Sequence, residues 1–124
     1  MKKYNFKKDG LTIIKKAIDP KIADFVYNYF LMKKQVTETF FNTKYISPFE
    51  KSWGVLGDLQ CPKSYSHYAD IAMELLLLQT LPTVEKHAKL RLSPTYSYAR
   101  VYTQGDELKR HTDRYSCEVS ATVN

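Results

Sequence analysis

The spacing of apolar residues changes at Ser93 and Pro94, and no other feature constrains the fold of this 124-residue chain as strongly. Before this point apolar residues recur at the intervals of helices that bury one face. After it, the run TYSYARVYT alternates between two faces, as the residues of a strand do. One of these faces would hold Tyr96, Tyr98, Arg100 and Tyr102. Helical segments followed by strands predict an α+β fold, and the length fits a single domain.

The first predicted helix begins at Pro20, a residue that suits the first helical position. Asp19 before it is a favourable N-cap residue. Apolar residues then keep helical spacing, and we expect Lys33 and Lys34 to complement the dipole at the C-terminal end of the helix.

A second helix is predicted over about residues 68–80. Its run MELLLL makes it apolar on nearly every side, so we expect it to be buried. Pro82 would either end this helix or start a short further one through TVEKHAKL.

Strands are predicted on both sides of the helices. The β-branched content of LTIIKKAI, residues 11–18, favours a short strand. Prolines and glycines interrupt residues 42–65, which predicts an irregular crossing with one short strand at 53–56. After TYSYARVYT, the sequence QGDE predicts a turn in which Gly105 takes a positive φ. An extended LKRHTD and a final strand CEVSATVN, residues 117–124, would follow.

The net charge of +6 comes almost entirely from the N-terminal lysines Lys2, Lys3, Lys7, Lys8, Lys15 and Lys16. A lysine-only patch without arginine argues against nucleic acid as a partner. Cys61 and Cys117 form no CxxC motif, and no apolar signal segment begins the chain, so we expect two free thiols in a reducing cytoplasm. The longest apolar run, residues 75–78, is far too short to span a membrane.

His111 and Asp113 are the candidate metal ligands. Residues i and i+2 of an extended segment project to the same side, so both side chains could take adjacent positions on one ion. Two histidines and one carboxylate are a ligand set of non-haem iron, and they leave one face of an octahedron open. The spacing alone is also compatible with a surface histidine beside a loop aspartate.

The surrounding run RVYTQGDELKRHTD resembles the signature of the iron(II)- and 2-oxoglutarate-dependent oxygenases, most closely their prolyl-4-hydroxylase-like branch. In that branch an Arg-x-Tyr element leads through a glycine turn and a leucine to His-x-Asp. A strand rich in valine, threonine and serine follows. The matching positions here are Arg100, Tyr102, Gly105, Leu108, His111 and Asp113, followed by CEVSATVN.

The resemblance implies a double-stranded β-helix, or jelly-roll, core. Helical support would cover about residues 1–92 and the first jelly-roll strands about residues 93–124. The chain would be a dioxygenase fragment that couples decarboxylation of 2-oxoglutarate to hydroxylation of a peptide, with peptidyl proline as the first expectation, or of a small molecule. O2 would be the oxidant, and ascorbate is an accessory reductant that the resemblance allows.

The resemblance also implies site roles. His111 and Asp113 would bind Fe(II), Tyr102 would hydrogen-bond 2-oxoglutarate, and Ser120 would lie near its distal carboxylate. Asn124 stands where some relatives have a tyrosine. Arg100 and Arg114 are candidates for substrate binding, although Arg100 could instead pair with Glu107 or Glu118.

The family pattern also requires a second, downstream histidine and a late basic residue that anchors 2-oxoglutarate. His67 and His87 precede the motif, and we expect them to be ordinary surface or capping residues. We therefore expect the chain to be the N-terminal part of a longer polypeptide that alone binds iron weakly and turns nothing over. Two alternatives remain open at this point. One is a non-catalytic jelly-roll binding module with an incidental His-x-Asp, and the other is a zinc or manganese site in a cupin-like protein.

Overall fold

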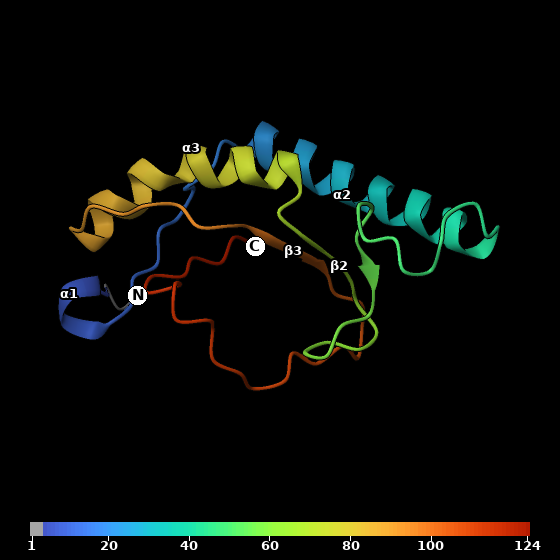
Figure 1. Cartoon of the computed structure of the whole chain (residues 1–124). Helices are drawn as coiled ribbons and strands as arrows, with labels where there is room; N and C mark the ends of the chain where they lie inside the picture. The colour runs from blue at the N-terminus through green and yellow to red at the C-terminus, as the bar shows by residue number, and fades with distance from the viewer. Residues whose placement is uncertain (1–3) are drawn as a thin grey trace.

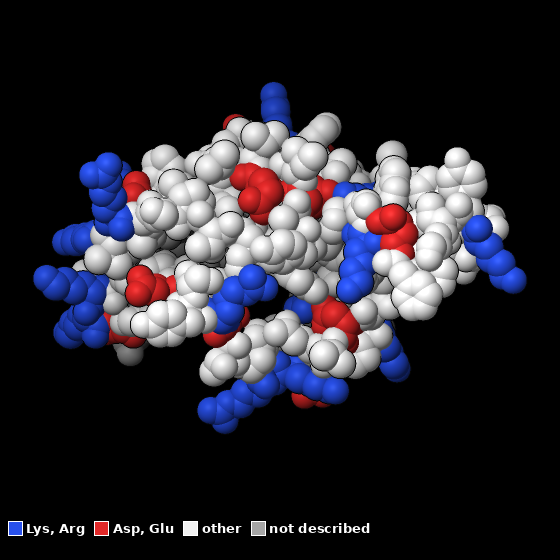
Figure 2. Space-filling view, in the orientation of Figure 1, with Lys and Arg blue, Asp and Glu red and all other residues white. Residues whose placement is uncertain are grey.

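The computed structural model describes residues 4–124, which form three helices and three strands. In chain order these are α1 (Phe6–Asp9), α2 (Pro20–Asn42), β1 (Val55–Leu56), β2 (Tyr65–Tyr68), α3 (Ile71–Ala88) and β3 (Tyr98–Val101). The predicted α+β class is confirmed. Lys2 and Lys3 of the lysine patch lie outside the described residues, and Lys7, Lys8, Lys15 and Lys16 are exposed. Figure 2 shows cationic side chains gathered at the end of the molecule where α1 lies in Figure 1.

The three strands form one antiparallel sheet in the order β1-β2-β3. Helices α2 and α3 run over one side of this sheet, and the segment after β3 runs below it (Figure 1). Phe30 of α2, Tyr65 of β2 and Met73 of α3 form the buried cluster between these layers, and the rings of Phe30 and Tyr65 lie 5.1 Å apart. Ala99 and Val101 of β3 pack against the cluster, which confirms the predicted alternation of this strand.

Helix α2 starts where the sequence predicts but does not end there. The Asp19 carboxylate accepts a hydrogen bond from the backbone N–H of Lys21, as expected of an N-cap residue. The predicted end near Lys33 and Lys34 is wrong, because the helix continues to Asn42. Buried Thr37 holds this extension, since its hydroxyl lies 2.9 Å from the backbone oxygen of Trp53. Lys33 is consequently a mid-helix residue.

Helix α3 runs through Pro82 to Ala88, so the predicted break at this proline is wrong. A proline in a helix removes the N–H that would bond the carbonyl four residues earlier, here that of Leu78. The predicted burial is also wrong, because Leu75 and Leu78 are more than half exposed. The sheet covers only one side of α3, where Met73 is buried.

Two glutamates of α3 hold the segment that returns from the helix to the sheet. Glu85 accepts from the backbone N–H of Leu92 at 2.7 Å, and Glu74 accepts from the backbone N–H of Ser97 at 2.7 Å. This segment therefore runs back along the helix before β3 begins (Figure 1).

Two predicted strands are absent from the described residues. Residues 11–18 and residues 117–124 form no ladder with a neighbour, and an extended run becomes a strand only when its backbone pairs. The strand predicted at 53–56 is reduced to Val55–Leu56, and β2 lies where an irregular crossing and a helix start were predicted. Within residues 93–124 only Tyr98–Val101 is a strand, so the sheet does not establish a jelly roll. The turn with a positive φ at Gly105 is confirmed.

Within the described chain, no helix combines the length and the apolar character needed to cross a membrane.

Candidate functional site

His111 and Asp113 lie side by side on the extended segment after β3. The Nε2 atom of His111 is 3.6 Å from Oδ1 of Asp113. The other ring nitrogen of His111, Nδ1, is 2.8 Å from the backbone oxygen of Lys109 and must donate to it, because a carbonyl only accepts. Ser120 donates its hydroxyl to Oδ2 of Asp113 at 2.7 Å. Three predicted site residues therefore lie together, with Ser120 against a candidate ligand.

The pair fits two positions of a metal centre. A neutral histidine that donates from Nδ1 has its lone pair on Nε2, and a carbonyl partner on the far nitrogen is the usual arrangement of a metal-ligating histidine. Both side chains are partly exposed, at 29% and 46%, so an ion could reach them. Among residues 4–124, no three His, Cys, Asp or Glu side chains form a group that could hold a metal ion. The pair thus offers two ligands.

Arg100 lies in a second cluster on the outer face of the sheet. Its Nη2 atom donates to Oδ2 of Asp58 at 2.7 Å and to Oε1 of Gln60 at 3.1 Å. Its Nη1 atom donates to the phenol oxygen of Tyr102 at 3.2 Å, so that phenol keeps its own proton for another acceptor. The guanidinium also lies over the Tyr98 ring, 4.9 Å from the centroid. The partner of Arg100 is therefore Asp58 rather than Glu107 or Glu118.

The Asp58–Arg100 pair is largely shielded from water, with side chains 17% and 8% exposed. Burial alone would raise the pKa of Asp58, but hydrogen bonds from Arg100 and Tyr98 outweigh it and hold this pKa well below its usual range. Burial would lower the pKa of Arg100, but its hydrogen bonds with Asp58 and Tyr102 outweigh this effect and raise the pKa above its usual value. The Nε atom of Arg100 is buried, and within the described residues it has no hydrogen-bond partner.

Arg114 lies against two tyrosine rings. Its guanidinium carbon is 4.5 Å from the centroid of Tyr96 and 5.5 Å from that of Tyr68. The two rings are 4.9 Å apart, and Cys117 lies 3.5 Å from the Tyr96 hydroxyl. These contacts attach the segment after β3 to the end of β2.

A buried polar cluster beneath α2 was missed by the sequence analysis. Asp70 is 1% exposed, and its Oδ2 accepts from the Tyr29 hydroxyl at 2.8 Å and from the ammonium of Lys33. Its Oδ1 accepts from the backbone N–H groups of Ala72 and Met73, which makes it the N-cap of α3. The N-cap is a signal that could have been read from the sequence, whereas the pairing with Lys33 could not.

The same cluster contains His67, whose Nδ1 lies 2.8 Å from the Lys33 ammonium and so accepts from it. Its side chain is only 13% exposed, so the expectation of a surface histidine is wrong here. Burial and the nearby Lys33 charge lower the pKa of His67. Burial and the Asp70 carboxylate raise the pKa of Tyr29 to about 12. His87 is exposed, as expected, and its Nδ1 lies 2.8 Å from the Thr83 carbonyl oxygen of its own helix.

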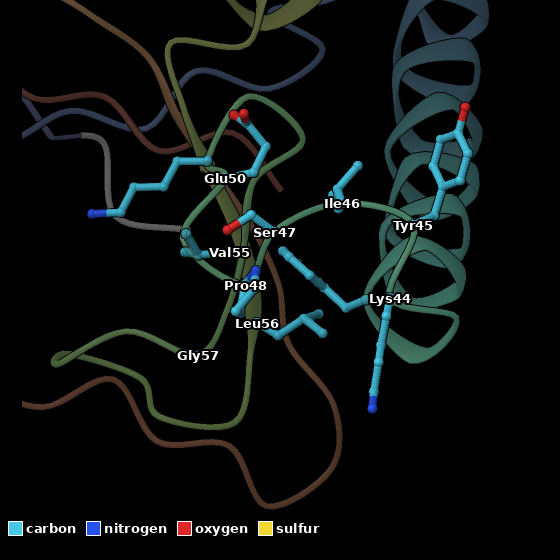
Figure 3. A pocket seen from close by; sticks show the side chains of 11 residues that line it. Lys44, Tyr45, Ile46, Ser47, Pro48, Glu50, Val55, Leu56 and Gly57 are labelled. Carbon is cyan, nitrogen blue, oxygen red and sulfur yellow. The ribbon is translucent and has the colours of Figure 1, made fainter.

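A groove of about 780 Å³ lies at the C-terminal end of α2. The groove is lined by Tyr45, Ile46 and Pro48 of the loop after α2 and by Val55 and Leu56 of β1, and Figure 3 shows Pro48 close to the two β1 residues. None of the predicted site residues lines it.

Comparisons of the chain with protein-family models, with curated proteins and with solved structures found no match.

Proposed function

We propose that this chain carries the His-x-Asp part of the metal centre of an Fe(II)- and 2-oxoglutarate-dependent dioxygenase. The observation that carries the proposal is the arrangement of His111 and Asp113. The Nε2 atom of His111 and Oδ1 of Asp113 lie 3.6 Å apart, and the other ring nitrogen, Nδ1, donates to the Lys109 carbonyl. A metal-ligating histidine usually donates its other ring N–H to such an acceptor, which fixes the tautomer and the orientation of the ring.

In this proposal His111 and Asp113 would hold the iron, and Ser120 would orient the Asp113 carboxylate through its hydroxyl. Tyr102 would donate its free phenol proton to 2-oxoglutarate. The bound iron and 2-oxoglutarate would supply the oxidising chemistry, and the residues of this chain would position them. The substrate would be a peptide, with peptidyl proline as the first candidate, or a small molecule. A cytoplasmic location and a jelly-roll core belong to the same proposal.

The test is an anaerobic titration of the 124-residue chain with Co(II), a spectroscopically visible substitute for Fe(II). We expect weak binding with a visible absorption band, and loss of that band in His111→Ala and Asp113→Ala. His87→Ala is the matched control, because His87 is exposed and its Nδ1 lies against the Thr83 carbonyl of its own helix, away from His111 in the sequence. An unchanged band in both ligand variants would refute the proposal.

Turnover tests the second part of the proposal. Two ligands without a third among residues 4–124 would hold the metal weakly, so we expect no succinate from 2-oxoglutarate above the level given by free Fe(II). Robust succinate formation by these 124 residues would contradict the prediction that a site with two ligands is inactive.

A non-catalytic binding module is the second candidate. The groove beside β1 favours it, because its apolar lining includes Tyr45, Pro48 and Leu56, while no third ligand joins His111 and Asp113 in the described residues. A chain that binds neither Co(II) nor Zn(II) in the titration would favour this candidate. Preference for Zn(II), with tetrahedral Co(II) spectra, would favour a zinc site instead.

A further inference from the structure

The segment that carries His111 and Asp113 is attached to the rest of the fold on both sides of the pair. On one side, the backbone N–H of Lys109 donates to the backbone oxygen of Gln60 at 2.9 Å. On the other, Arg114 lies against Tyr68 and Tyr96, as described above. Residues 102–124 form no helix or strand, so such attachments decide where the pair lies.

The attachment at Gln60 is part of a hydrogen-bonded turn, residues 58–61. Oδ1 of Asp58 accepts from the backbone N–H of Gln60 at 2.8 Å and from that of Cys61 at 2.7 Å. The backbone oxygen of Cys61 accepts from Ser64, and Cys61 is 1% exposed. Gly57 before the turn has a φ of +87°, and a Cβ there would collide with the Pro62 carbonyl. The backbone of the turn is therefore fixed from both sides.

The side chain of Arg100 holds the same turn by hydrogen bonds to the side chains of Asp58 and Gln60. It reaches from β3 to Oδ2 of Asp58 and to Oε1 of Gln60 with a single nitrogen, and its side chain is 8% exposed. The position of Gln60 is thus tied to the edge strand β3, which pairs with the central strand β2 along its full length.

We propose that Gln60 is a positioning residue for His111. Its side chain is held by Arg100, and its backbone oxygen holds Lys109. The backbone oxygen of Lys109 in turn receives the Nδ1 proton of His111, and the Nε2 atom, 3.6 Å from Oδ1 of Asp113, stays unprotonated and able to bind a metal ion. The metal-related part of this inference rests on the proposed function, but the effect on the histidine tautomer does not.

The experiment measures the tautomer of His111 and the exchange of the Lys109 amide by NMR on the metal-free chain. We expect the Nδ1–H tautomer in the native chain, whereas free histidine favours Nε2–H. Gln60→Leu removes the hydrogen bond between Arg100 and the Gln60 side chain but leaves the one to Asp58. The Lys109 amide should then exchange about ten-fold faster, and His111 should shift towards the Nε2–H form. Gln60→Glu keeps an oxygen for Arg100 and should behave as the native chain does.

Two controls separate positioning from general loss of structure. Gln35→Leu makes the same replacement on the exposed side of α2 and should change neither readout. The paired amides of β2 and β3 should keep their native exchange rates in Gln60→Leu. An unchanged tautomer in Gln60→Leu would overturn the inference, and so would equal acceleration of the Lys109 amide and the strand amides.

Co(II) affinity measured on the same variants distinguishes this inference from the proposed function. We expect Gln60→Leu to weaken Co(II) binding by about ten-fold, the effect typical of removing a partner behind a metal ligand. Absence of Co(II) binding in the native chain would refute the proposed function, while the tautomer and exchange data would still decide the role of Gln60.

Discussion

Replacing Asp70 by asparagine should destabilise the fold strongly, because it breaks the ion pair with Lys33 in the polar cluster beneath α2. Asparagine retains an oxygen that can cap α3, so the N–H groups of Ala72 and Met73 keep their acceptor. What is lost is the negative charge that faces Lys33, whose side chain is 12% exposed. Breaking a buried ion pair by removing one partner costs about 3–5 kcal/mol, because the other charge stays buried without compensation.

The slight exposure of Lys33 places Asp70→Asn near the lower end of this range, at about 3 kcal/mol. Asp70→Ala should cost about 1 kcal/mol more, because it also removes the N-cap. Lys33→Met should recover much of the loss in the double variant Lys33→Met/Asp70→Asn, since neither charge then remains. The free energies of the two single variants and the double variant would therefore not add.

The assay is urea denaturation followed by far-ultraviolet circular dichroism, with the midpoint and the slope fitted separately. Asp70→Asn should lower the midpoint at an unchanged slope. A loss below about 0.5 kcal/mol, or strict additivity in the double variant, would refute the reasoning, because surface pairs behave in that way.

The stability of the fold in acid should also depend on the Asp70–Lys33 ion pair. Burial would raise the pKa of Asp70, but hydrogen bonds from Lys33 and Tyr29 lower it below its ordinary value. A carboxylate whose pKa is lower in the folded than in the unfolded state stabilises the fold fully above the unfolded pKa, near about 3.9. This contribution is lost as the pH falls through the lower folded value, so Asp70→Asn should lose less stability in acid than the native chain.

Two further predictions concern the turn and the histidine. Gly57→Ala should cost about 2–3 kcal/mol in urea denaturation, because its Cβ would meet the Pro62 carbonyl at a positive φ. Gly105→Ala, with a similar φ but open space around it, should cost only about 1 kcal/mol, and equal losses would contradict the reasoning. His67 should titrate below its ordinary pKa of 6.5 in NMR, because burial and Lys33 disfavour its charged form. The stability that neutral His67 contributes is present above pH 6.5 and lost as the pH falls through the lower folded value, so His67→Asn should flatten this decline.

Local rules were enough to predict several parts of the fold. The cap at Asp19, the alternation of β3 and the turn at Gly105 depend on residues close in sequence, and all three are confirmed. The proximity of His111 and Asp113 is of the same kind, because residues two apart in an extended segment project to one side. Their role as metal ligands remains a prediction.

The parts that failed depend on contacts between distant segments. Nothing near Lys33 indicates that α2 continues beyond it or that Asp70 lies opposite, since these residues are 37 positions apart. Likewise Arg100 pairs with Asp58, 42 positions away, although nearer glutamates were available. Tertiary packing decided these features, and a sequence pattern contains no direct information about it.

The proline within α3 has a mechanical consequence. Pro82 removes one backbone hydrogen bond, and a helix weakened in this way tends to bend at that point. Glu74 and Glu85, however, lie on opposite sides of the proline. Both accept hydrogen bonds from the returning segment, Glu74 from the N–H of Ser97 and Glu85 from the N–H of Leu92. That segment should resist bending of the helix, because a bend at Pro82 would have to lengthen or break one of these two hydrogen bonds. Glu85→Ala should therefore loosen the far half of the helix while leaving the half near the sheet in place.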